Sequence, residues 1–200
     1  MDKEFIPYDT VRNNALKLAA RIYTSGFIPD VIYVSLRGGA YMGNVISEFF
    51  KRVNTGDHPV FYAAVVAHSY SDIRKNSQVR IDGWTYSPDH LRSGDKILFI
   101  DDIFDTGKTV NFLVDVLLQR GLPRKDIKVA VHDYKVYLGR DELPIQPDFY
   151  CRKLVIENLS QDRWIHYMSH ELVGLTKAEQ EKYYISRDPE LQTVFELLNS

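Results

Sequence analysis

A short segment in the middle of the chain brings together residue types able to bind an anion and a cation. Two adjacent carboxylates, Asp101 and Asp102, follow the apolar run 96–100, and the turn 105–109 (Asp-Thr-Gly-Lys-Thr) opens a helical pattern. The glycine of this turn lets the backbone approach a ligand closely, and the first amides of a helix favour an anion. Adjacent carboxylates repel each other, and a ribose diol together with Mg²⁺ would engage both. The segment therefore predicts a site for a sugar phosphate.

Two other interpretations of this segment compete with a sugar-phosphate site. Asp101 and Asp102 could be a capping pair in front of an ordinary helix start, but the fourteen-residue string 96–109 as a whole argues against that. A Walker A loop is excluded because its leading glycine and its spacing are absent. In an open α/β sheet the ligand lies beyond the carboxyl ends of the strands, so the loop 36–39 and the segment after His132 are expected at the same edge.

Alternating strands and helices must position these loops. Apolar runs typical of strands occupy 31–35, 60–67, 96–100, 127–132 and 149–156, and helical patterns occupy 9–26, 40–52, 109–120 and 189–198. The strand at 96–100 is expected to stop at Asp101. The long polar stretch 69–93 is expected to be a loop that acts as a lid or binding segment. This alternation predicts an α/β fold with a parallel sheet and right-handed crossovers.

Composition narrows the class of protein. The 200 residues are 44% hydrophobic and 26% charged, with a net charge of −2 and one cysteine. These values argue against a disordered or membrane protein and against a disulfide framework. A start without a basic and apolar leader predicts a cytoplasmic protein, and the lack of a long apolar run predicts no membrane partner. The balanced charge predicts no nucleic-acid partner, with a local basic patch left open.

The string 96–109 resembles the phosphoribosyl pyrophosphate signature of the type I phosphoribosyltransferases. From about Val31 to Glu171 the chain is similar to the purine-salvage branch, the hypoxanthine-guanine and xanthine-guanine phosphoribosyltransferases. The resemblance implies the family's parallel sheet flanked by helices, with a small hood and a C-terminal helical appendage. We expect a phosphoribosyltransferase domain over 1–175, its hood at about 149–171 with N-terminal contributions, and a helical extension over 176–200.

The resemblance also implies roles for the central segment. Asp101 and Asp102 would face the ribose hydroxyls, with Asp102 the first choice as a ligand of Mg²⁺. The segment 106–109 would hold the 5′-phosphate, and Asp105 would lie near N7 of a purine as the general acid/base. The residues assigned to phosphoribosyl pyrophosphate are Arg37, Gly38, Gly39, Ser69, Tyr70, Asp101, Asp102, Asp105, Thr106, Gly107, Lys108 and Thr109.

Two further segments match the family in position. Arg37-Gly38-Gly39 fits the pyrophosphate loop, in which the peptide before the basic residue is often cis, so Leu36–Arg37 is a candidate cis bond. As an isolated pattern, Arg-Gly-Gly is equally an ordinary strand-to-helix turn. Ser69-Tyr70 resembles the start of the mobile catalytic loop of the hypoxanthine-guanine enzymes. The basic residues that follow, Arg74, Lys75 and Arg80, are either pyrophosphate ligands or solvated side chains.

The last part of the resemblance concerns the base. Lys135 stands where the family has a lysine that contacts the purine 6-oxo group. Trp164 is the candidate for stacking on the base, with a core position as the alternative, and Ile165 is the candidate for backbone contacts at its edge. The stretch 166–171 departs from the Pro-Trp-containing stretch of the xanthine-guanine enzymes. Glu171, about one residue out of register, is assigned to the metal.

The sequence thus predicts a Mg²⁺-dependent transfer of the phosphoribosyl group from phosphoribosyl pyrophosphate to hypoxanthine or guanine, with xanthine left open. Two alternatives stand beside it. One is a regulatory protein that senses phosphoribosyl pyrophosphate without significant transferase activity, and the other is a transferase for a pyrimidine or another nitrogen base. We expect a homodimer, because the aromatic-rich tail needs to be covered.

Overall fold

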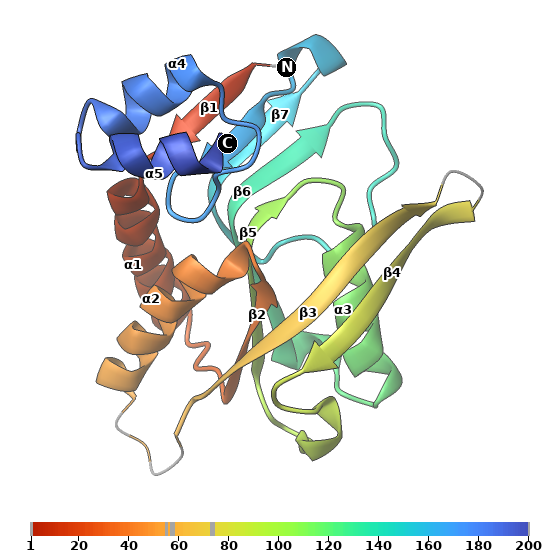
Figure 1. Cartoon of the computed structure of the whole chain (residues 1–200). Coiled ribbons are helices and arrows are strands. Elements are labelled where there is room, and N and C mark those ends of the chain that lie inside the picture. The colour runs from red at the N-terminus through yellow and green to blue at the C-terminus, as the bar shows by residue number, and fades with distance from the viewer. Residues whose placement is uncertain (1, 55, 57–58, 73–74, 200) are drawn as a thin grey trace. The chain divides into compact units, whose positions relative to one another are not determined.

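The computed structural model describes residues 2–54, 56, 59–72 and 75–199 (Figure 1). The chain divides into two compact units, Met1–Ser169 and His170–Ser200. Among the described residues, no helix combines the length and the apolar character that crossing a membrane requires.

The first unit is built on a six-stranded sheet in the order β4-β3-β2-β5-β6-β7. Its strands are β2 (Val31–Leu36), β3 (Phe61–Asp72), β4 (Lys75–Trp84), β5 (Ile97–Phe104), β6 (Ile127–Tyr137) and β7 (Phe149–Ile156). All neighbouring pairs are parallel except β3 and β4. This parallel sheet flanked by helices confirms the predicted fold class.

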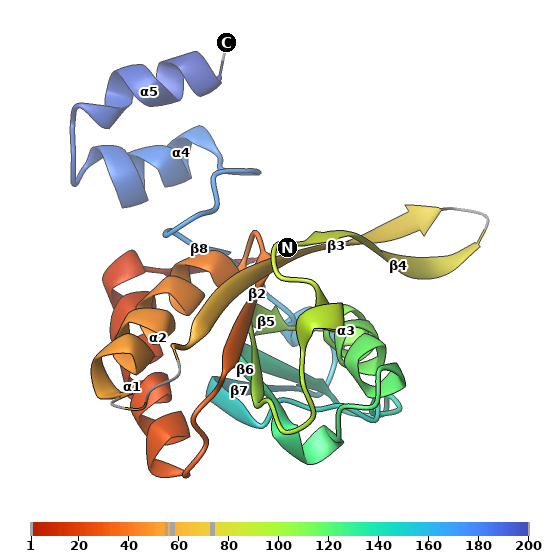
Figure 2. The same cartoon turned by 90° about the horizontal axis from the view of Figure 1, so that it is seen from below.

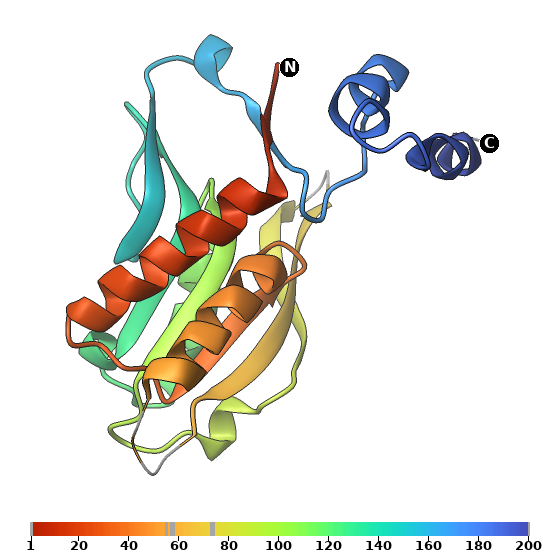
Figure 3. The ribbon, with the colours of Figure 1, turned by 90° about the vertical axis from the view of Figure 1, so that its left-hand side faces the viewer.

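Helices cover both faces of the sheet. Helices α1 (Tyr8–Thr24) and α2 (Gly39–Val53) lie side by side over one face (Figure 3), and α3 (Lys108–Gln119) lies over the other (Figure 2). Successive residues of a strand point to opposite faces, so Ile32 and Val34 join the core under α1 and α2, whereas Val31 and Tyr33 join the core under α3. Both faces of the central strands are therefore buried, as their unbroken apolar runs predict.

Two strands differ from the prediction made for them. Strand β5 does not stop at Asp101 but continues to Phe104, with Asp101 opposite Val131 and Phe104 opposite Tyr134. Its partner β6 likewise continues to Tyr137. The prediction of a strand end was wrong because ladder hydrogen bonds join backbone groups and do not require apolar side chains.

The polar stretch 69–93 is also not the expected loop. Strands β3 and β4 form a long antiparallel hairpin through it, with Ser69 opposite Val79 and Tyr70 opposite Gln78 (Figure 1). A short 3-10 helix, Pro88–His90, follows. An antiparallel pair satisfies its backbone groups without an apolar run, so composition alone could not identify these strands.

A second, two-stranded sheet joins the N-terminal segment to a late one. Strand β1 (Lys3–Ile6) pairs in parallel with β8 (Trp164–Tyr167), and Lys3 lies opposite Trp164. The strands are only four residues long, and neither stands out in the sequence.

The second unit is helical. Helix α4 (Lys177–Gln180) begins at a capping box of Thr176 and Glu179, continues as a π-helical segment (Glu181–Ile185), and is followed by α5 (Leu191–Leu198). The rings of Tyr184 and Phe195 pack against each other within this unit, with their centroids 5.4 Å apart.

Candidate active site

The loops with the predicted functions follow neighbouring strands. Strands β2, β5 and β6 are adjacent in the sheet and parallel, so the segments after their carboxyl ends meet at one edge. The loop 36–39 follows β2, the segment 105–109 follows β5, and Lys135 lies near the end of β6. This edge is where we place the candidate site.

The loop after β2 lies directly against the end of β5. The peptide bond Leu36–Arg37 is cis, as the resemblance suggested, and Arg37 is exposed. A Cβ atom at position 38 would collide with the Asp102 carboxylate, and one at position 39 would collide with the carbonyl oxygen of Ile100. Packing against the backbone therefore requires glycine at position 39, and the closeness of Gly38 to Asp102 places the candidate pyrophosphate loop against the paired carboxylates.

The two carboxylates are held by backbone amides. Asp102 N donates to Asp101 Oδ1 at 3.0 Å, and Ile103 N donates to Asp102 Oδ1 at 2.8 Å. Burial, followed by the charge of Asp102, raises the pKa of Asp101 well above its usual range. Two adjacent carboxyl groups share negative charge most easily with a cation beside them, and hard carboxylate oxygens are the ligands Mg²⁺ takes. Asp101 and Asp102 thus fit a magnesium ion. Glu171 belongs to the second unit, and its role as a metal ligand stays a prediction.

The turn after β5 has a geometry that suits an anion. Gly107 caps α3 with a φ of 73°, a left-handed conformation, and a Cβ atom there would collide with the ring of Phe104. Helix α3 begins at Lys108, so its first backbone amides point out of the N-terminal end of the helix. Those amides and the positive end of the helix favour a phosphate group. Asp105 and Thr106 are exposed in the same turn.

Lys135 is buried in an ion pair. Its Nζ donates to Asp162 Oδ1 at 2.6 Å and to the carbonyl oxygen of Arg163 at 3.0 Å. Burial alone would raise the pKa of Asp162, but hydrogen bonds from Lys135 and Tyr137 outweigh it and lower that pKa below its usual value. An ammonium group carries three hydrogens, so one remains for a ligand.

The hood strand β8 begins beside this ion pair. Trp164 follows Arg163 directly, and its side chain is 52% exposed, which excludes the alternative of a core position. Ile165 is buried, and its backbone lies in the ladder with β1. The backbone of Trp164 is therefore one residue from a group that Lys135 contacts, and stacking of its ring on a base stays a prediction.

Two of the predicted binding residues lie outside the described side chains. The backbones of Ser69 and Tyr70 belong to β3, and of their side chains nothing is described. Arg74 lies outside the described residues altogether. Their predicted contacts with phosphoribosyl pyrophosphate stay predictions.

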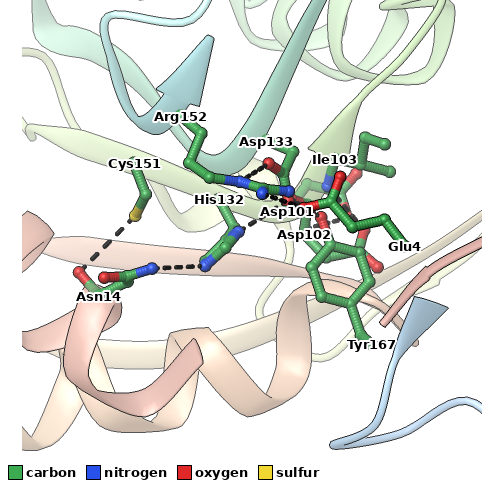
Figure 4. Close-up of polar contacts among 10 residues, drawn as sticks. All are labelled: Glu4, Asn14, Asp101, Asp102, Ile103, His132, Asp133, Cys151, Arg152 and Tyr167. Atoms are coloured by element: carbon green, nitrogen blue, oxygen red, sulfur yellow. Dashed lines mark hydrogen bonds and ion pairs between the residues drawn. The ribbon is translucent and has the colours of Figure 1, made fainter. Parts of the chain in front are cut away.

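A buried polar cluster that the sequence did not reveal lies beside the paired carboxylates (Figure 4). At its centre, Asp133 has no exposed surface and accepts from Arg152 Nε at 2.5 Å, from His132 Nδ1 at 2.7 Å and from the Tyr167 hydroxyl at 2.6 Å. Burial opposes ionisation of Asp133, but the hydrogen bonds from His132 and Arg152 outweigh it, so its pKa is lowered. The cluster therefore holds a buried negative charge.

The cluster reaches several elements. His132 Nε2 lies 3.0 Å from the Asn14 amide on α1, and Arg152 Nη1 donates to Glu4 on β1 at 2.5 Å. The Tyr167 hydroxyl on β8 lies 3.0 Å from the carbonyl oxygen of Asp102. Hydrogen bonds of the cluster thus connect both strands of the small sheet, β1 and β8, to the end of β5. No local spacing could have predicted it, because its members come from segments far apart in the sequence.

Several known proteins are similar to the chain in sequence or in fold. No family model matches it. The Bifunctional protein PyrR of Brevibacillus brevis is 30% identical over 128 residues, which cover 64% of this chain and 68% of that protein. A purine phosphoribosyltransferase structure from Pyrococcus horikoshii, 20% identical, covers 88% of this chain and 100% of its own with a TM-score of 0.63. The Helicobacter pylori xanthine-guanine-hypoxanthine phosphoribosyltransferase, also 20% identical, covers 82% and 92% with a TM-score of 0.57.

The two structures share the fold of this chain, and the PyrR protein is a relative in sequence. The chain belongs to the type I phosphoribosyltransferase family.

Proposed function

We propose that the protein transfers the 5-phosphoribosyl group from phosphoribosyl pyrophosphate to a 6-oxopurine. Hypoxanthine and guanine are the preferred bases and xanthine is left open. The products are a nucleoside 5′-monophosphate and pyrophosphate. The observation that carries this proposal is the position of Lys135. This buried cation, with one hydrogen left to donate, lies on the strand next to the phosphate turn and is linked through Asp162 and Tyr137 to Asp105.

The donor would be held by backbone amides and fixed charges. The segment 106–109 would bind the 5′-phosphate at the start of α3, while Arg37 and the amides of Gly38 and Gly39 would face the pyrophosphate. Asp101 and Asp102 would hold Mg²⁺, which when bound neutralises charge on the departing pyrophosphate. Positioning and electrostatic stabilisation of a ribosyl cation would supply most of the rate enhancement.

The base would be selected by hydrogen-bond direction. A bond forms from a ring nitrogen of the purine to C1 of the ribose as the bond from C1 to the pyrophosphate oxygen breaks. Asp105 would take up the proton that the purine loses near N7. Lys135 can only donate, so it suits a 6-oxo group and meets the 6-amino group of adenine donor to donor.

The test is nucleotide formation from phosphoribosyl pyrophosphate and Mg²⁺, with hypoxanthine, guanine, xanthine, adenine and uracil offered separately. We expect turnover with at least one 6-oxopurine and none with adenine. Turnover with uracil alone would overturn the assignment of the base.

Replacing Trp164 with alanine is expected to raise the KM for the base by about tenfold, because stacking of one base on an aromatic ring contributes roughly 1–3 kcal/mol. Steady-state kinetics with the preferred base measures this. Trp164→Phe keeps a stacking ring and should retain most of the affinity, and the KM for phosphoribosyl pyrophosphate should not change in either variant. An unaltered KM for the base would remove Trp164 from the base site.

The second candidate function is a regulatory protein that binds phosphoribosyl pyrophosphate without significant transferase activity. It is favoured by the name of the relatives, which describes them as bifunctional. Calorimetric binding of phosphoribosyl pyrophosphate with no turnover of any of the five bases would support this candidate over the transferase.

A further inference from the structure

Tyr137 lies between Asp105 and the ion pair of Lys135 with Asp162, and the proposed function has Asp105 and Lys135 contact the base. It follows Lys135 by two residues on β6, so the two side chains leave the sheet on the same face. Its hydroxyl oxygen lies 2.5 Å from Asp105 Oδ1 and 3.0 Å from Asp162 Oδ2. Nothing in the spacing of the sequence singles out this tyrosine.

The contacts form one continuous chain, in which the single hydroxyl hydrogen of Tyr137 serves two carboxylates. Asp162 uses one carboxylate oxygen for Tyr137 and the other for Lys135, whose Nζ lies 2.6 Å away. The chain therefore runs Asp105, Tyr137, Asp162, Lys135, with an acidic group and a donor in alternation. One end of the chain is Asp105, the candidate proton acceptor, and the other end is Lys135, the candidate hydrogen-bond donor to the 6-oxo group.

The hydroxyl at the centre carries one hydrogen, which it donates to Asp105 or to Asp162 or shares between them. Burial, followed by the hydrogen bond and charge of Asp105 and then those of Asp162, raises the pKa of Tyr137. A phenol that stays neutral can separate two carboxylates that would otherwise repel each other. The guanidinium carbon of Arg140 lies 4.1 Å from the centroid of the Tyr137 ring, a cation–π contact that restrains the ring. The side chain of Tyr137 is thus restrained at its hydroxyl by the two carboxylates and at its ring by Arg140.

We propose that Tyr137 is a positioning residue of the transfer reaction. Its hydroxyl orients the Asp105 carboxylate and, through Asp162, sets the separation between Asp105 and Lys135 so that one 6-oxopurine reaches both. This inference rests on the proposed function. It assigns Tyr137 no contact with the donor, so binding of phosphoribosyl pyrophosphate should not depend on the hydroxyl.

The kinetic test replaces Tyr137 with phenylalanine, which removes only the hydroxyl. We expect kcat to fall roughly tenfold to a hundredfold, because hydrogen bonds to charged groups contribute about 1.5–3 kcal/mol, while the KM for phosphoribosyl pyrophosphate stays within twofold. Tyr134→Phe is the matched control. Tyr134 lies on the same strand, but its hydroxyl donates to Gln146 Oε1 at 2.6 Å, so its kcat should equal that of the wild type. An active wild type with an equally active Tyr137→Phe variant would overturn the inference.

A spectroscopic measurement tests the contact without turnover. With ¹³C-labelled aspartate, the side-chain carboxyl resonance of Asp105 should move in Tyr137→Phe and stay in place in Tyr134→Phe. Thermal melting of both variants checks that each is folded. A wild type inactive with every base would overturn the proposed function by itself, and an Asp105 resonance unmoved by Tyr137→Phe would then separately overturn the positioning role.

Discussion

Replacing Asp105 with asparagine is expected to lower kcat by about 10²–10⁴-fold while the Kd for phosphoribosyl pyrophosphate changes little. The carboxylate is exposed in the turn between β5 and α3 and accepts from the Tyr137 hydroxyl. Asparagine has nearly the same shape and its carbonyl oxygen can still accept that hydrogen bond, but it cannot take up the proton that the purine loses. The substitution therefore separates proton transfer from binding.

The measurement compares kcat with a 6-oxopurine against the calorimetric Kd for phosphoribosyl pyrophosphate in the presence of Mg²⁺. Asp115→Asn on the exposed face of α3 removes a carboxylate elsewhere in the same unit and should leave both quantities unchanged. Unchanged turnover in Asp105→Asn would remove Asp105 from catalysis. A loss of binding equal to the loss of kcat would show that it holds the donor instead.

Replacing Asp133 with asparagine is expected to lower the free energy of unfolding by about 3 kcal/mol at neutral pH. The Asp133 side chain is fully buried and compensates the charge of Arg152, which the substitution leaves buried without its main partner. Arg152 keeps Glu4 and is 30% exposed, so we expect the lower end of the range for broken buried pairs. For a chain of 200 residues this corresponds to a drop in Tm of roughly 6–12 °C.

The stabilisation by Asp133 should disappear in acid. Its pKa is lowered in the folded state, so the folded protein prefers the charged form and the stabilisation is complete above the unfolded pKa of about 3.9. It is lost as the pH falls through the lower, folded pKa. Denaturant unfolding should therefore show the gap between wild type and Asp133→Asn narrowing below about pH 4. A gap independent of pH would contradict a charged Asp133, and Asp115→Asn controls for the loss of a surface carboxylate.

Much of the fold followed from local patterns. The apolar runs of β2, β5 and β6 predicted a doubly covered parallel sheet because a strand buried on both faces has no polar alternation. Strand β7 has the predicted bounds. The hairpin β3–β4 was missed, since an antiparallel pair needs no apolar run. The β1–β8 pair was missed because two four-residue strands 157 residues apart leave no periodicity to detect.

The candidate donor site is mostly local in sequence, and the candidate base site is not. The turn from Asp105 to Thr109 carries its own glycine, hydroxyls and helix start within five residues, so the sequence alone predicted a turn suited to a phosphate and the paired carboxylates before it. Only the tertiary structure decided that Lys135 is paired with Asp162 and that Tyr137 links this pair to Asp105. The physical reason is the separation in sequence between the residues that interact. A turn depends on the backbone angles of a few consecutive residues. A hydrogen bond between residues 25 or more positions apart exists only once β5, β6 and the segment before β8 are packed together.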